Sequence, residues 1–194
     1  MKLGEIADIV SGQNMTRISA SSAPERVLRT VKVLIPKAIV EGMVIEDELG
    51  DEEITKEIDA EKCTKVGDII IKLSSPYDSA LIGDGQTGIA IPSFCAAIRL
   101  KESTFNKLYL TAVLNTKAVR EGLAARVAGS IRPMIRIADL KDLDLPIIPE
   151  KDMEDIGKAF LLSGKKKRLL QEMISIEQDI MENIIVASMG GTEL

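Results

Sequence analysis

The chain has 194 residues, enough for one domain of ordinary size plus an extension, or for two small domains. It contains no histidine, which excludes Ser-His-Asp and Cys-His triads and most catalytic zinc sites. The net charge is −5, but residues 41–62 hold ten acidic and two basic residues, which leaves +3 for the rest of the chain. A basic face outside this acidic segment is therefore compatible with a nucleic-acid partner.

The two cysteines, Cys63 and Cys95, are far apart in the sequence and outside any Cys-x-x-Cys pattern. We interpret them as reduced, buried and structural thiols. The sequence does not open on a signal-peptide pattern, and no apolar run approaches the roughly 20 residues of a membrane span. We therefore expect a soluble cytoplasmic protein without a membrane partner.

The first third of the chain predicts short elements joined by polar loops. Residues 1–12 fit either a short helix or a tight turn followed by a strand, and they end at a glycine. Residues 13–24 are polar and predict a loop. Residues 27–40 contain β-branched clusters interrupted by Pro36, which predicts two short strands or a strand and a turn. The acidic residues 41–60 predict an exposed hairpin or loop.

The middle third predicts a β-rich region. The Gly67-Asp68 pair is a turn signal, and residues 69–73 form an apolar run typical of a buried strand. Three more short apolar runs follow at 80–82, 88–91 and 94–100, separated by glycine and proline. Such spacing favours an antiparallel barrel or sandwich.

Helical periodicity begins at residue 106. Residues 106–128 predict one or two amphipathic helices, and residues 131–140 and 143–149 predict short extended pieces. Residues 151–186 then lack proline and follow Pro146 and Pro149, which are helix start signals. At about 1.5 Å per residue this helix is on the order of 54 Å long.

Apolar residues recur along this last segment at steps of three, four and seven, which marks one face of an α-helix. A helix of this length exceeds what a small domain needs to cover its core. We predict that it projects and buries its apolar stripe against another helix as a coiled coil, and a helix folded back on its own domain is the alternative. The stripe comprises Met153, Ile156, Phe160, Leu169, Met173, Ile176, Ile180 and Ile184.

Two motifs with possible chemistry are better explained by turns. Residues 83–88 form a Gly-x-Gly-x-x-Gly string, but Ile-Ala-Ile-Pro follows instead of the helix that a phosphate-binding site needs. Residues 74–77, Ser-Ser-Pro-Tyr, resemble a degraded form of the motif with which amino-methyltransferases hold a flipped base. Both serines replace the residues that this chemistry requires. A stand-alone S-adenosylmethionine-dependent methyltransferase therefore stays only an alternative.

A more consistent signal is a set of arginines around a Gly-Ser loop. Arginine can bind guanine with two hydrogen bonds, while serine and tyrosine hydroxyls can position phosphates. The run Lys165–Arg168 on the long helix fits phosphate contact or a solvated helix face equally well. We predict no catalytic residue and no metal ligand. The predicted DNA-binding residues are Arg17, Lys72, Ser74, Tyr77, Arg126, Ser130, Arg132 and Arg136.

Several segments resemble the specificity subunit of type I restriction-modification systems. They are LGEIADIVSG at 3–12, VGDIIIKLSS at 66–75, YLTAVLNTKAVREGLAARVAGSIRPMIRIADLKDLDLPIIP at 109–149, and the long helix that follows. Each motif is loose by itself, and the resemblance depends on their order and spacing over nearly the whole chain.

The resemblance implies an α/β (α+β) fold with a target recognition domain at 1–148, a helical spacer at 149–188 and a tail at 189–194. It implies a non-catalytic subunit that recognises a DNA half-site and docks a methyltransferase subunit, which brings S-adenosylmethionine and methylates adenine. A restriction motor subunit is an optional further partner. The chain itself is expected to bind no cofactor.

The family's usual subunit carries two recognition domains and two helical spacers, whereas this sequence shows one of each. The resemblance therefore implies a half-length form that pairs through its helix, in an antiparallel coiled coil, with a second copy or with another half-specificity chain. A twofold dimer would recognise a bipartite palindromic target. The alternative from a different class is a coiled-coil adaptor protein that does not bind DNA.

Overall fold

The computed structural model describes residues 1–22, 26–101, 105–131 and 133–189. Its centre is an antiparallel sheet in the order β1 (Ala7–Ser11), β8 (Cys95–Leu100), β6 (Ile69–Lys72) and β7 (Ser79–Leu81). Strand β6 is buried along its whole length, as its unbroken apolar run predicts. Because side chains alternate along a strand, Ile69 and Ile71 enter the core on one face of the sheet and Ile70 the core on the other.

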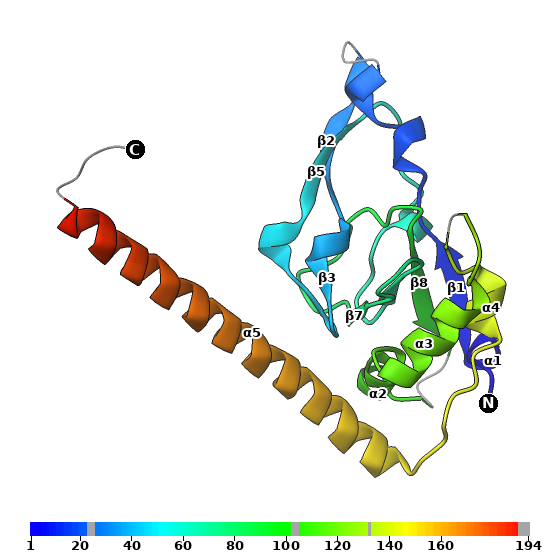
Figure 1. Ribbon diagram of the computed structural model, residues 1–194. Helices are drawn as coiled ribbons and strands as arrows, with labels where there is room; N and C mark the ends of the chain where they lie inside the picture. Colours follow the sequence, from blue (N-terminus) through cyan, green and yellow to red (C-terminus); the bar gives the residue numbers. More distant parts are fainter. Residues whose placement is uncertain (23–25, 102–104, 132, 190–194) are drawn as a thin grey trace.

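Helices cover the first of these faces (Figure 1). They are α1 (Leu3–Ile6), α2 (Lys107–Leu114), α3 (Lys117–Arg126) and α4 (Ile137–Lys141). The side chains of Asn106 and Thr116 cap the first turns of α2 and α3 by accepting backbone N–H groups. The prediction of two helices between residues 106 and 128 is therefore confirmed.

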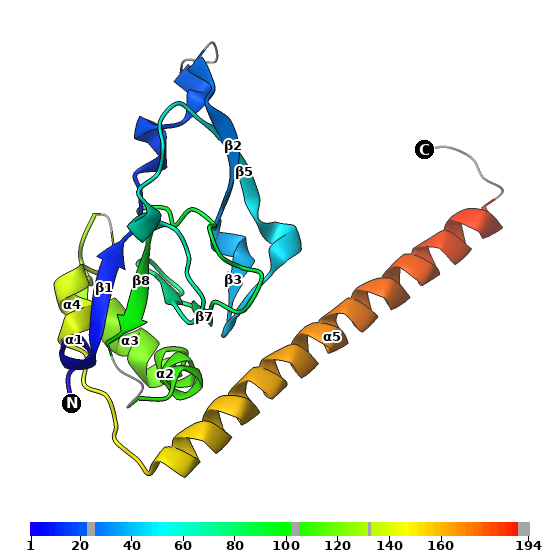
Figure 2. The ribbon, with the colours of Figure 1, turned by 180° about the vertical axis from the view of Figure 1, so that it is seen from behind.

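Two small antiparallel sheets complete the globular region, by which we mean residues 1–148. Strand β2 (Arg29–Val33) pairs with β5 (Gly50–Ile54), and β3 (Ile39–Val40) pairs with β4 (Met43–Val44). The β2–β5 sheet extends away from the four-stranded sheet, as Figures 1 and 2 show from opposite sides. Short 3-10 turns join these strands, namely η1 (Met15–Arg17), η2 (Ala20–Ser22), η4 (Pro36–Ala38), η5 (Glu46–Glu48) and η6 (Ala60–Lys62).

Three local expectations were wrong. The strands form separate open sheets and not a barrel or sandwich. Residues 88–91 form no strand, because Ala90 makes only single bridges, with Val33 and with Cys63. Residues 131–140 are not simply extended, because they contain the first four residues of α4, which starts at a capping box between Arg136 and Asp139.

Helix α5 (Glu150–Ser188) follows Pro149 and confirms the long helix. Its first half packs on α2, where Met153 and Gly157 are buried. Every residue from Leu169 to Met189 is exposed, and this second half extends past the globular region (Figure 1). The helix thus lies against its own domain at one end and projects at the other. Whether the projecting end forms a coiled coil stays a prediction, as does the division into recognition domain, spacer and tail.

Candidate nucleic-acid interface

The structure joins the segment that follows the Gly-Ser loop to the end of β6. Ser74 forms a bridge with Met134, and the N–H of Ile135 donates to the carbonyl of Leu73 at 2.8 Å. The segment that leads into α4 is therefore held against the strand end. This surface, which we call the α3–α4 surface, comprises half-buried Ser74 and the exposed residues Arg126, Ser130 and Arg136.

The two described arginines of this surface converge on Asp139. Arg136 donates two guanidinium hydrogen bonds to the Asp139 carboxylate, at 3.0 and 3.1 Å, and Arg126 donates to the Asp139 carbonyl. The hydrogen bonds from Arg136 hold the pKa of Asp139 below its usual value. Both guanidinium groups lie at the surface and are oriented by one residue. Arg132, which belongs to the same predicted set, lies outside the described residues.

Two other predicted residues have side chains inside the domain. Tyr77 is buried in the core on the helix side of the sheet. Lys72 is also buried, and its ammonium lies 2.8 Å from the Asp78 carboxylate. These two residues shape the turn that follows β6, and the turn exposes Ser75 and Pro76. Ser-Ser-Pro-Tyr is a strand-ending turn, as the sequence favoured.

Arg17 lies apart from the α3–α4 surface. It is exposed in η1, on the segment that leads from β1 to the β2–β5 sheet (Figure 1). No other charged residue lies between Ser11 and Ser22, and the Lys62 ammonium donates to the Gln13 side chain at 3.2 Å. Arg17 therefore marks a second exposed polar region of the globular region.

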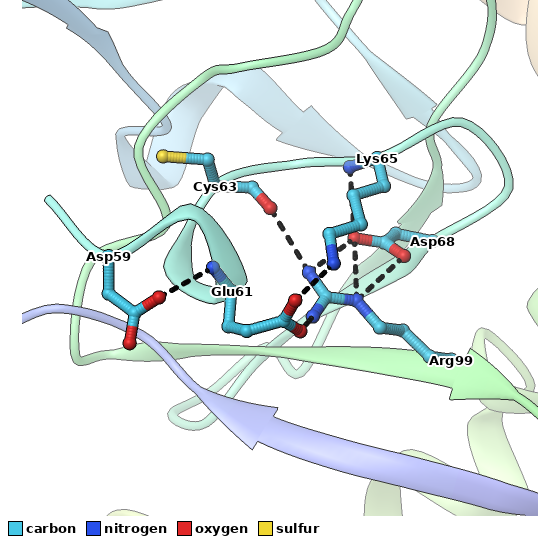
Figure 3. A network of polar contacts seen from close by, with 6 residues as sticks. All are labelled: Asp59, Glu61, Cys63, Lys65, Asp68 and Arg99. Atoms are coloured by element: carbon cyan, nitrogen blue, oxygen red, sulfur yellow. Dashed lines mark hydrogen bonds and ion pairs between the residues drawn. The ribbon is translucent and has the colours of Figure 1, made fainter.

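The Gly67-Asp68 turn is fixed by an ion-pair network that the sequence did not indicate (Figure 3). Arg99 on β8 donates from Nε to both oxygens of Asp68, at 3.0 and 3.2 Å, and also pairs with Glu61. Burial alone would lower the pKa of Arg99, but the hydrogen bonds and the charge of Asp68 raise it. No local pattern links residues so far apart in the chain. The network supports the loop and leaves few charges free, so we assign it a structural role.

The projecting half of α5 carries two apolar stripes, of which one was predicted from the sequence. The predicted stripe residues Leu169, Met173, Ile176, Ile180 and Ile184 are all exposed. The expectation of one continuous stripe was wrong, because Phe160 precedes Leu169 by nine residues, which places the two groups on opposite faces of the helix. Of the earlier group, Met153 is buried, Phe160 is half-buried and Ile156 is 46% exposed. The second stripe is displaced by one residue from the first and has Glu177 at one of its five positions, and helical spacing in the sequence could have revealed it. It comprises Leu170, Ile174, Met181 and Ile185, all exposed.

A groove of about 700 Å³ lies where α5 passes the globular region. Charges of both signs line it, including Lys37, Glu41, Asp78, Arg120, Lys167 and Arg168. Among the described residues, no group of three or more histidine, cysteine, aspartate or glutamate side chains could hold a metal ion. No helix in the described part of the chain is long and apolar enough to cross a membrane.

The sequence matches no protein-family model. It also matches no curated protein sequence. Solved structures do share its fold. The HsdS subunit from Thermoanaerobacter tengcongensis superposes with a TM-score of 0.58 at 16% identity, over 89% of this chain and 39% of that chain. The type I restriction-modification system S subunit from M. genitalium gives a TM-score of 0.55 at 15% identity, over 94% and 43%.

A third chain comes from a structure titled for complex assembly and conformational transition of the type I R-M system. It gives a TM-score of 0.60 at 15% identity, over 95% of this chain and 42% of that chain. The chain therefore has the fold of the S subunits of type I restriction-modification systems, and it spans about two fifths of the length of the chains it resembles.

Proposed function

We propose that this chain is the sequence-specific DNA-recognition subunit of a type I restriction-modification complex, a DNA adenine methyltransferase. The observation that carries the proposal is a fold shared with S subunits over about nine tenths of the chain. In this role the chain performs no catalysis. S-adenosylmethionine binds to the partner methyltransferase subunit, and a restriction motor subunit can join the complex. Such a complex acts on the chromosome, in the cytoplasm.

The α3–α4 surface is the proposed DNA-facing surface. Arg126 and Arg136 present guanidinium groups that can bind guanine edges or phosphates, and Ser74 and Ser130 add polar groups at the same place. Arg132, which lies between Ser130 and Arg136 in the sequence, is proposed as a DNA-binding residue from the sequence alone. Lys72 and Tyr77 contribute by shaping the turn that holds Ser74. Arg17 makes a further contact from the segment beside the β2–β5 sheet.

The projecting half of α5 is the proposed site of assembly. At about 100° per residue, the second stripe lies roughly a quarter turn from the first, so the two cover about half of the helix circumference. Gly157 and Gly164 lie on the face of α5 that contacts the globular region. Farther along the helix, the same face carries the polar residues Gln171, Ser175 and Glu182. The apolar half therefore faces away from the chain's own domain.

Two adjacent apolar stripes can bury two partner helices. We assign the stripe through Ile176 and Ile180 to an antiparallel coiled coil with a second copy or another half-specificity chain. We assign the stripe through Ile174 and Ile185 to the methyltransferase subunit. A paired molecule holds two recognition domains at a fixed separation and recognises a bipartite target.

The test is to map methylated adenines across the host genome with and without this gene. Loss of methylation at one bipartite motif is the expected result. A palindromic motif indicates a homodimer, and two different halves indicate a second specificity chain. Unchanged methylation, together with a purified chain that does not shift DNA in the presence of its partners, would instead establish a coiled-coil adaptor. Micromolar binding of S-adenosylmethionine by the isolated chain would favour a stand-alone methyltransferase.

A further inference from the structure

The turn between β3 and β4 is fixed to the edge of the main sheet. Glu41 and Gly42 form this two-residue turn and both have positive φ, 31° and 98°, as tight hairpins require. The N–H of Gly42 donates to the carbonyl of Ser79 at 2.8 Å, and its carbonyl accepts from Leu81 at 3.1 Å. Both partners belong to β7, so the turn cannot move independently of the sheet.

The same turn touches α5 on its other side. A Cβ added to Gly42 would lie 2.6 Å from Cε1 of Phe160, and a Cβ added to Gly164 would lie 3.3 Å from the carbonyl oxygen of Glu41. The ammonium of Lys167 lies 2.7 Å from the Glu41 carboxylate. The turn is therefore enclosed between the sheet edge and the helix, without space for a Cβ at Gly42 and with a tight fit for one at Gly164.

A second close contact lies two helical turns earlier. A Cβ on Gly157 would meet Cβ of Leu108 at 2.5 Å and the backbone nitrogen of Tyr109 at 2.7 Å, both on α2. Helix α5 thus touches α2 at Gly157 and the hairpin turn at Gly164. Two contacts about 10 Å apart determine the direction of a rigid helix.

We propose that the Glu41–Gly42 turn and Gly164 are positioning residues, which set the angle at which α5 leaves the globular region and thereby the spacing between the two half-sites. The link between the helix angle and the spacing of the half-sites rests on the proposed function. With Gly157 as the pivot, Asn183 lies about 39 Å along the helix and Gly164 about 10 Å. A displacement of about 1 Å at Gly164 therefore moves the helix end by about 4 Å. That distance is close to the rise of one base pair.

The test variant is Gly164→Leu, and the matched control is Gly122→Leu. Gly122 lies on α3 with nothing within 4 Å of an added Cβ, so both substitutions give a helix the same gain in propensity but only one meets the hairpin turn. Gly164→Ala, whose added carbon needs only a small displacement, is the milder variant for use if the leucine variant does not fold.

The first readout does not involve DNA. Spin labels at Lys117→Cys on α3 and Asn183→Cys on α5, in a Cys63→Ser chain, report the distance between the globular region and the helix end. An excess of unlabelled chain separates intramolecular from intermolecular pairs. We expect a shift of about 4 Å or more for Gly164→Leu, a smaller shift for Gly164→Ala, and none for Gly122→Leu. Equal distances in all folded variants would overturn the inference.

The second readout is methylation by the assembled complex on DNAs whose half-sites are separated by spacers that differ in single base pairs. The parent chain should prefer one spacer, Gly164→Leu a spacer changed by at least one base pair, and Gly122→Leu the parent spacer. A shifted label distance with an unchanged spacer would overturn the link to spacing. If the parent complex methylates at no spacer, the proposed function fails, while the label distances still decide the positioning role.

Discussion

The ammonium of Lys72 lies 2.8 Å from the carboxylate of Asp78, with only 9% and 10% of the two side chains exposed. The other Asp78 oxygen lies 2.7 Å from the Arg120 guanidinium and forms an ion pair with it. Arg120 in turn donates to Asn115, which bonds to the backbone and hydroxyl of Ser79. This chain of contacts ties the turn after β6 to the start of β7 and to α3. It also turns Arg120 inward, away from the other arginines of its segment.

Asp78→Ala should therefore destabilise the protein strongly. It leaves Lys72 buried without its counter-ion and Arg120 with only Asn115, and loss of one partner of a buried pair costs about 3–5 kcal/mol. Urea unfolding measures the difference. The control is Asp51→Ala, which breaks an exposed pair with Lys32 and should cost less than about 1 kcal/mol. Similar losses in both variants would contradict a special role for the buried pair.

The two stripes of α5 should separate pairing from methyltransferase docking. Ile176→Glu with Ile180→Glu should abolish pairing of specificity chains, because carboxylates cannot be buried without partners in a helix interface. Sedimentation velocity measures the pairing, and circular dichroism checks that the globular region remains folded. A dimer that survives this double change would exclude the first stripe from the pairing interface.

The companion variant is Ile174→Glu with Ile185→Glu. It should preserve pairing and lose co-purification with the methyltransferase subunit. Both pairs of substitutions place two carboxylates on exposed positions of the same helix, so charge and helix propensity are matched. Loss of pairing in both variants would show a single interface and contradict the assignment of two stripes.

Arg17→Ala should weaken DNA binding by the assembled complex and reduce the slope of log K against log salt by about one, the signature of one lost phosphate contact. The free energy of unfolding should not change, because Arg17 is exposed. The control is Arg29→Ala, since Glu57 already binds that guanidinium at 2.7 Å. The prediction fails if the two variants show the same salt slope.

The two thiols should differ in reactivity. Burial raises the pKa of Cys95 to about 12, whereas the same cause raises that of half-buried Cys63 less far. Iodoacetamide at pH 8.5 should therefore modify Cys63 first and Cys95 only after unfolding, which mass spectrometry can follow. Modification of native Cys95 at the rate of Cys63 would contradict its burial.

Cys95 should also make stability depend on alkaline pH. The unfolded thiol ionises near pH 9 and the folded thiol near pH 12, so the unfolded state binds fewer protons between these values. The contribution of this group is complete below pH 9 and falls by up to about 1.4 kcal/mol per pH unit above it. Cys95→Ala should remove that part of the slope in urea unfolding measured from pH 8 to 10.

The sequence alone was sufficient for elements whose signal is local. The apolar period and the absence of proline predicted α5, the unbroken isoleucine run predicted β6, and periodicity predicted α2 and α3. The order of loose motifs also indicated the type I specificity-subunit fold that the solved structures share. The signals for the individual helices and strands each lie within one element, where spacing along the chain determines which side chains share a face.

Tertiary structure decided everything that depends on a distant partner. The acidic strand β5 found its partner in β2, Lys72 and Arg120 turned inward because Asp78 lies between them, and Arg99 reached the Gly67-Asp68 turn. It also decided that the first half of α5 packs on α2 and the hairpin turn while the second half projects. A helical stripe shows only that some partner must cover it, because the packing surface that covers it comes from residues far away in the chain.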